Sequence, residues 1–158
     1  MNWNTFATVA ETAAALAAKE VSAVELATHY LDRANALQPT LNTYITLDRE
    51  RTLVEARAAD AKRAAGDAST LLGVPIAHKD IYLIDGWRTT CGSKMLENFV
   101  APYTSTVVKN MSDAGMVTLG KLNMDEFAMG SSNESSYFGT VKNPWHVSRV
   151  PGGYTVGS

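Results

Sequence analysis

The chain has 158 residues, enough for a domain with a hydrophobic core, and 46% of them are hydrophobic. With 14 Lys and Arg against 16 Asp and Glu, it lacks the basic excess with which proteins hold nucleic acid by themselves. A single cysteine excludes an internal disulfide, and no apolar run is long enough to span a bilayer. The N-terminus has no signal-peptide pattern, so we predict a cytoplasmic protein without a membrane role.

Two pairs of residues near the start of the chain have capping-box spacing, Thr8 with Glu11 and Ser22 with Glu25. The first pair predicts the start of an alanine-rich helix. The second predicts a longer helix with its apolar residues on one stripe. We expect this helix to stop before Pro39, because proline cannot continue an α-helix.

A third helix is predicted after a short β-rich run at 43–47. Asp48 offers an N-cap and Gly66 a natural end. A narrow apolar stripe predicts that this helix lies on the surface of the fold; the stripe consists of Val54, Ala58, Ala61 and Ala65.

The remainder of the chain, 67–158, predicts the start of a sheet. Apolar runs occur at 71–77 and 81–84, and the run at 116–119 predicts a buried strand. From Asn123 onward the sequence is rich in Gly, Ser, Asn and Pro, which predicts a long loop of the kind that carries function or is disordered.

One further helix is predicted over 104–114, with Val107, Val108 and Met111 facing inward. No repeat and no linker divides the chain. The sequence therefore predicts a single domain over 1–158.

The segment 73–80 brings a lysine to the end of an apolar strand. Burial disfavours the ammonium form, so Lys79 could act as a neutral base that activates a serine. The alternative is that Lys79 leaves the strand into solvent and pairs with Asp80. His78 is interpreted as structural or exposed, because the other histidines are not spaced to form a metal site with it and there is no Cys/His cluster.

Three other features have both a functional and a purely structural interpretation. Cys91 could be a nucleophile, but nothing supplies an activating environment, so a small buried residue is favoured. The polar run 131–136 could line a pocket or be a solvated loop. Gly152 and Gly153 could allow close backbone approach or be slack at a chain end.

Several long motifs resemble the amidase-signature family, and within it the A-subunit branch of the tRNA-dependent amidotransferases. The residues that carry the resemblance are 73–80, 89–94, 121–134, 138–139, 143–145 and 149–153. The resemblance implies an α/β fold with a mixed β-sheet flanked by α-helices. The chain would hold its N-terminal portion, mainly helical over 1–66 and with the start of the sheet over 67–158.

The resemblance also implies a Ser–cis-Ser–Lys triad in which Lys79 is the lysine. The loop that borders the substrate amide would be formed by Met129, Gly130 and Ser131. Tyr154 stands where the family has its relay serine, and the nucleophilic serine would follow Ser158. One triad position of three is therefore present, and the isolated chain is expected to be inactive.

The implied amide donor is glutamine, with asparagine as the alternative. Its ammonia would pass to a B subunit that uses ATP and magnesium to activate misacylated Glu-tRNA(Gln) or Asp-tRNA(Asn), and a small C subunit would complete the heterotrimer. The chain itself would hold no cofactor and no metal and would reach tRNA only through the B subunit. Two alternatives stay open, an inactive relative that keeps only a partner-binding surface and a hydrolase of small amides.

Overall fold

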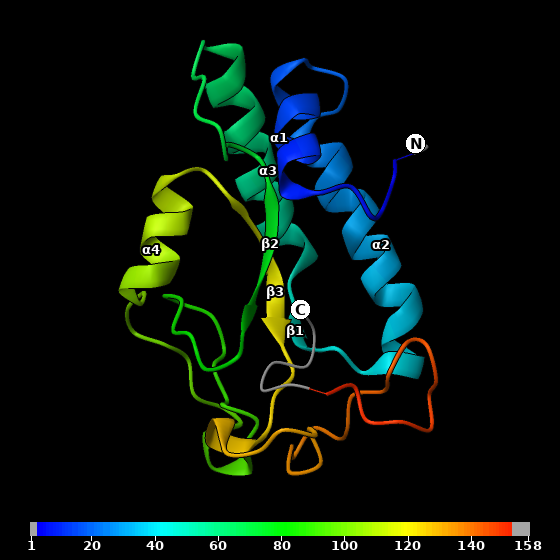
Figure 1. Ribbon diagram of the computed structural model, residues 1–158. Coiled ribbons are helices and arrows are strands. Elements are labelled where there is room, and N and C mark those ends of the chain that lie inside the picture. The colour runs from blue at the N-terminus through cyan, green and yellow to red at the C-terminus, as the bar shows by residue number, and fades with distance from the viewer. Residues whose placement is uncertain (1–2, 153–158) are drawn as a thin grey trace. The chain divides into compact units, whose positions relative to one another are not determined.

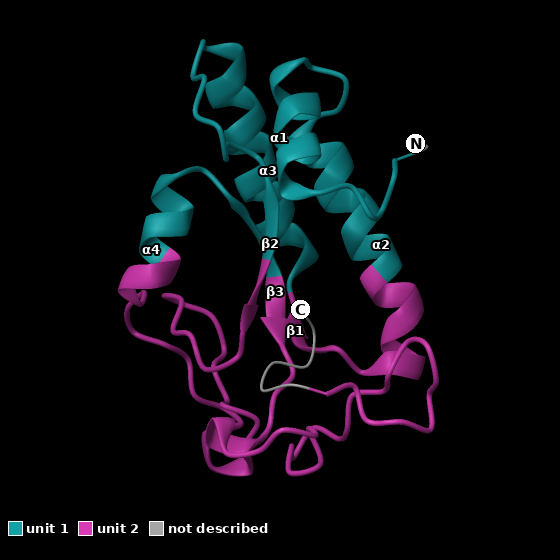
Figure 2. Ribbon diagram, in the orientation of Figure 1, with its two compact units in different colours: residues 1–33, 48–76, 109–119 teal, residues 34–47, 77–108, 120–158 magenta. Residues whose placement is uncertain are grey.

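The chain divides into two compact units, each assembled from separate stretches of sequence (Figure 2). The computed structural model describes residues 3–152. Unit 1 comprises 1–33, 48–76 and 109–119, and unit 2 comprises 34–47, 77–108 and 120–158.

The helices are α1 (Val9–Ala17), α2 (Ala23–Leu41), α3 (Arg49–Ala64) and α4 (Thr106–Asp113), and the strands are β1 (Tyr44–Leu47), β2 (Pro75–Lys79) and β3 (Val117–Leu122) (Figure 1). The strand order is β1-β3-β2, with β1 antiparallel to β3. The hydrogen bonds from Val117 N to Val74 O and from Asp80 N to Leu122 O advance together along β3 and β2, as in a parallel pair. The sheet is therefore mixed, and the predicted α/β fold is confirmed.

Both predicted capping boxes are present. The Thr8 hydroxyl accepts from Glu11 N at 3.2 Å, and the Glu11 carboxylate accepts from Thr8 N at 2.7 Å. At the start of α2, Glu25 N donates to the Ser22 hydroxyl and Ser22 N donates to the Glu25 carboxylate, at 3.1 and 2.9 Å. Each box satisfies backbone N–H groups that a helix start leaves without an intrahelical partner.

Two more free N–H groups of α2 are satisfied from α3. Ala23 N and Val24 N donate to the two oxygens of the Asp60 carboxylate, at 2.8 and 3.1 Å. The start of α3 is capped by Asp48 as predicted, and Gly66 follows its end with a φ of 98°.

The predicted end of α2 was wrong, because the helix includes Pro39 and continues to Leu41. A proline costs one backbone hydrogen bond and crowds the preceding turn. Pro39 lies in the last turn, where little helix remains to be disturbed. The helix ends two residues later, before Asn42, which has a left-handed φ of 55°.

The predicted apolar stripe of α3 does not face the core, since its first member Val54 is 58% exposed. The buried face consists of Thr52, Ala56 and Ala59. The Thr52 hydroxyl donates to Thr118 O of β3 at 2.7 Å, so a polar side chain is satisfied inside unit 1.

The core of unit 1 contains the buried side chains of Leu16, Leu26, Leu72, Val74 and Val117. Gly73 lies so close to α2 that an added Cβ would come within 2.9 Å of the Ala23 Cβ. Small residues at both positions allow the start of β2 to approach the helix.

In unit 2, an apolar cluster forms from Ile84, Trp87 and Val108 of α4. Val107 was predicted to face inward as well, but it is 41% exposed. Two of its members, Ile84 and Trp87, come from the long connection after β2, so this connection contributes to the core of unit 2.

Candidate active site

Lys79 is the last residue of β2 and is half-buried. Its backbone carbonyl accepts from Tyr82 N at 3.0 Å, and the next residue donates from Asp80 N to Leu122 O of β3 at 3.1 Å. The peptide group that joins Lys79 to Asp80 is therefore held on both sides. The fold fixes the backbone from which the Lys79 side chain extends.

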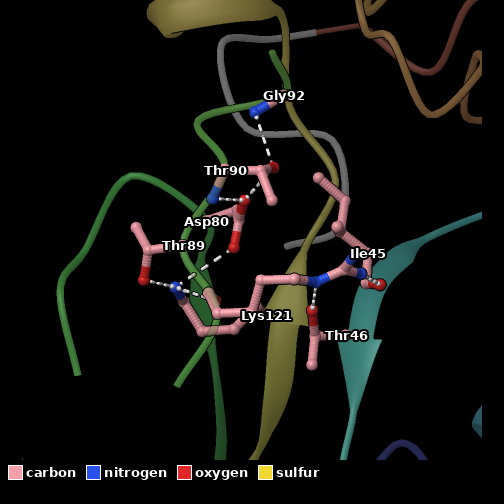
Figure 3. Close-up of polar contacts among 8 residues, drawn as sticks. Ile45, Thr46, Asp80, Thr89, Thr90, Gly92 and Lys121 are labelled. Carbon is pink, nitrogen blue, oxygen red and sulfur yellow. Dashed lines mark hydrogen bonds and ion pairs between the residues drawn. The ribbon is translucent and has the colours of Figure 1, made fainter. Parts of the chain in front are cut away.

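The carboxylate of Asp80 meets a second lysine, Lys121 of β3. The Lys121 ammonium lies 3.1 Å from a carboxylate oxygen of Asp80, and both side chains are completely buried. The other carboxylate oxygen accepts from Thr90 N and the Thr90 hydroxyl, at 2.7 and 2.5 Å. Figure 3 shows Asp80 between Lys121 and Thr90.

The same network holds the segment 88–90. Lys121 donates to the Thr89 hydroxyl at 2.9 Å (Figure 3). The Arg88 guanidinium donates to Ile45 O and to the Thr46 hydroxyl of β1, at 2.8 and 3.2 Å. One short segment is thus bound to β1, to β3 and to Asp80, the residue that follows β2.

The electrostatics of this cluster follow from burial. Desolvation lowers the pKa of Lys121, while the neighbouring Asp80 carboxylate opposes the shift. Burial, with a further contribution from Lys121, lowers the pKa of His78 to about 4, so this imidazole is neutral near pH 7. His78 is 5% exposed, in agreement with its interpretation as a structural residue.

A second polar network organises the loop after β3. The Asp125 carboxylate accepts from Asn133 N at 2.9 Å and from the Ser135 hydroxyl at 2.8 Å. Burial raises the pKa of this carboxyl, but the hydrogen bonds from Asn133 and Ser135 outweigh it and the net pKa is lowered. A Cβ on Gly130 would lie 2.6 Å from a carboxylate oxygen of Asp125, so only glycine fits there.

The predicted substrate loop lies on the outside of this network. Met129 is 78% exposed, and Ser131 is exposed as well. The polar run 131–136 is neither a uniform pocket lining nor a uniformly solvated loop, because it contains the buried residues Asn133 and Ser136.

The segment 91–93 links the two networks. Phe127 N donates to Cys91 O at 2.8 Å, and the Ser93 hydroxyl donates to the Glu126 carboxylate at 2.6 Å. Both contacts lie just before Met129 in the chain. The structure therefore connects the residues around Lys79 to the start of the predicted substrate loop through one segment.

Cys91 is half-buried, not fully buried as predicted, and has a left-handed φ of 52°. Burial and the Asp80 carboxylate raise the pKa of its thiol, which keeps it in the less nucleophilic protonated form. Within 3–152, no three His, Cys, Asp or Glu side chains gather as a metal site would require, and no helix there is both long and apolar enough to cross a membrane.

Tyr154, which interrupts the resemblance to the amidase-signature motif, and Ser158, which matches its last serine, lie outside the described residues, as does Gly153. Gly152 is described and has a φ of 80°, with open space around it. The expectations about a relay serine and a nucleophile therefore stay predictions.

Sequence reasoning missed the partnership of Lys121 with Asp80. A signal was present, because Lys121 interrupts an otherwise apolar run and buried charges require a partner. The identity of that partner depended on how β2 and β3 pair, which no local pattern reveals.

The Amidase family model matches residues 25–158, and the chain belongs to this family. More particular similarity is to the A subunits of glutamyl-tRNA(Gln) amidotransferases. That of Chromobacterium violaceum is 60% identical over 98% of this chain, and that of Thiobacillus denitrificans is 64% identical over 92%. The chain spans 32% and 30% of these two proteins.

Solved structures agree with this assignment. The peptide amidase of Stenotrophomonas maltophilia matches 98% of this chain with a TM-score of 0.88 and 32% identity, over 33% of its own length. The A subunit of glutamyl-tRNA(Gln) amidotransferase from Thermotoga maritima matches 86% of this chain with a TM-score of 0.70 and 37% identity, over 27% of its own length. The fold of this chain is therefore the fold of the matching third of these two structures.

Proposed function

We propose that this chain is the N-terminal portion of the A subunit of a glutamine-dependent tRNA amidotransferase. In this function the protein releases ammonia from glutamine for the transamidation of misacylated tRNA. The observation that carries the proposal is the identity of 60% over 98% of the chain to the A subunit of such an enzyme. The identity to the peptide amidase is about half as high, at 32%.

In this function Lys79 is the base at the end of a proton relay. It takes up the proton that leaves the attacking serine, which would follow Ser158, through a relay position that Tyr154 occupies in this chain. A base at such a place must be held within reach of the group it serves. The doubly hydrogen-bonded peptide group after Lys79 supports this role.

Met129, Gly130 and Ser131 would border the amide of the bound glutamine. The support is the geometry at Gly130, where the chain passes directly over the Asp125 carboxylate. A loop held in this way presents its outer side chains and backbone in a fixed conformation, which binding of a small polar substrate requires.

The partners that follow are a B subunit, which uses ATP and magnesium to activate the misacylated tRNA, and a small C subunit. We assign tRNA binding to the B subunit, because this chain has a formal net charge of −2 and no basic excess. The proposed site of action is the cytoplasm.

A second candidate is a hydrolase of small amides that needs neither tRNA nor partners. The structural match to the peptide amidase favours it, since its TM-score of 0.88 exceeds the 0.70 of the Thermotoga maritima protein. The two candidates differ in what they require, because only the amidotransferase passes ammonia to a partner.

The test is to place an affinity tag at the N-terminus encoded by the native gene and to measure the intact mass and the co-purifying proteins. We expect a product about three times as long as this chain, because the related A subunit has about that length. We also expect two further subunits to co-purify and the complex to release ammonia from glutamine. A product of 17.0 kDa that releases no ammonia would contradict the proposal. Release of ammonia from peptide amides by a product that purifies alone would favour the second candidate.

A further inference from the structure

The buried ion pair of Asp80 and Lys121 is unusual in its surroundings. Both side chains are completely buried, whereas those of the ion pair of Lys109 with Asp113 are 65% and 61% exposed. Removing two charges from water costs about as much as their mutual attraction returns, so a buried ion pair is a poor source of stability. Its placement points to another role.

Most polar contacts of the pair reach beyond the pair itself. Asp80 accepts two hydrogen bonds from Thr90, and Lys121 donates to the Thr89 hydroxyl at 2.9 Å and toward Arg88 O at 3.5 Å. Each charge is thus satisfied largely by the segment 88–90. The pair binds that segment to the ends of β2 and β3, as Figure 3 shows.

The pair is also one residue away from Lys79. The Asp80 backbone donates to β3 and its side chain holds the segment 88–90, so this residue cannot turn without breaking contacts on two sides. The chain before it carries Lys79. Rotation about the backbone at Asp80 would therefore redirect the Lys79 side chain.

We propose that Asp80 and Lys121 are positioning residues whose buried ion pair fixes the direction of the Lys79 side chain. The proposal rests on the proposed function, in which Lys79 is the base. In this proposal the pair acts on the reaction through Lys79 and does not contact the substrate.

The first test measures Lys79 directly and needs no catalysis. Competitive acetylation of the folded chain, followed by mass spectrometry, gives the labelling rate of Lys79 relative to the exposed Lys62. The double variant Asp80→Asn/Lys121→Met removes both charges together, so no buried charge is left alone. We expect Lys79 to label about threefold faster or more, because local opening exposes it.

The matched control is Lys109→Met/Asp113→Asn, which makes the same two changes in an exposed ion pair. It should leave the relative labelling rate of Lys79 unchanged. If the buried double variant folds and its Lys79 labels at the parent rate, the proposal is wrong.

A milder variant covers the case in which the double variant does not fold. Thr89→Val exchanges a hydroxyl for a methyl group of the same shape and removes one of the oxygen atoms that Lys121 contacts, leaving Asp80 and Arg88 O in place. We expect faster labelling of Lys79 here too, by a smaller factor. A folded Thr89→Val protein with unchanged labelling would likewise overturn the proposal.

The second test measures ammonia release from glutamine by the full product of the gene with its partners. A misdirected base should lower kcat about tenfold or more, while KM for glutamine stays within about twofold, since binding does not use Lys79. A purely structural pair would instead lose kcat only in proportion to the unfolded fraction. If Lys79→Ala keeps full turnover, the proposed function fails, and the labelling experiment still decides whether the pair positions Lys79.

Discussion

The helices of unit 1 and the loop segments of unit 2 satisfy their backbone groups in different ways. At the starts of α1 and α2, the capping boxes bond N–H groups through side chains three residues away, as in Thr8 with Glu11, and only α2 adds a more distant acceptor, Asp60. In unit 2, Asp80 bonds Thr90 and Asn123 bonds Asn42 O, partners that are 10 and 81 residues distant in sequence. Irregular backbone in unit 2 is held by buried polar side chains from distant parts of the chain.

The two units also differ in backbone conformation. Non-glycine residues with a left-handed φ occur in unit 2 at Asn42, Cys91, Phe127, Ala128 and Asn133, and in unit 1 at Lys19, among the described residues. Such conformations persist only where the surrounding contacts enforce them, and they gather at functional sites. The difference indicates that the contacts of unit 2 hold more strained backbone than those of unit 1.

The largest effect is expected from Lys121→Met alone. This change leaves the Asp80 carboxylate buried without its counter-charge, which should lower the free energy of unfolding by about 3–5 kcal/mol. Lys109→Met, in the exposed pair, should cost at most about 1 kcal/mol. Urea unfolding of both variants checks the contrast, and equal costs would show that burial of the pair has no energetic consequence.

A pH effect is expected from His78. Its pKa is lowered from 6.5 to about 4 in the folded state, so between these values the unfolded chain binds a proton that the folded chain does not. Stability should therefore fall as the pH drops from about 6.5 to 4, by roughly 3 kcal/mol at most. His78→Gln should remove this slope, and the exposed His146→Gln should keep it. Thermal unfolding across this pH range measures both, and a parallel curve for His78→Gln would refute the assignment.

A smaller contrast is expected between two glycines with positive φ. Gly92 has a φ of 69°, and an added Cβ would lie 2.6 Å from Met124 O, whereas Gly66 has a φ of 98° and open space around it. Gly92→Ala should lower the free energy of unfolding by about 2–3 kcal/mol and Gly66→Ala by about 1 kcal/mol. Chemical unfolding gives the two values. Equal losses would mean that the contact between the segment 91–93 and the loop after β3 is loose.

The smallest effect is expected at the start of α2. Asp60→Ala removes the acceptor of Ala23 N and Val24 N and should cost about 1 kcal/mol, the usual value for a lost helix cap. Asp113→Ala, which breaks only an exposed ion pair, should cost about half as much or less. Differential scanning calorimetry would separate the two, and an unchanged transition in Asp60→Ala would show that water replaces the carboxylate.

The contrast between local and distant hydrogen-bond partners also explains which features the sequence could predict. Capping residues act on neighbours three positions away, so Thr8, Ser22 and Asp48 marked their helices correctly. Pro39 misled because its effect depends on how many turns follow it. Val54 misled because an apolar stripe does not say which face of a surface helix meets the rest of the fold.

The candidate site was predictable only in part. The motif around Lys79 placed a lysine at a strand end, and the structure has it there. The role of Lys121 was missed because its partner Asp80 follows another strand, 41 residues earlier in the chain, and only the pairing of β2 with β3 brings the two together. The contacts of Asp125 with the predicted substrate loop were missed for the same reason, since they depend on the course of the loop.

The role given to Lys79 is tested most directly by ammonia release from glutamine with the full gene product. Lys79→Ala is compared there with Lys109→Ala, a surface lysine of α4. We expect Lys79→Ala to lower kcat by about 10²–10⁴-fold, the usual loss when a general base is removed, and Lys109→Ala to leave kcat unchanged. Full turnover by Lys79→Ala would contradict the assignment of the strand end as the active site.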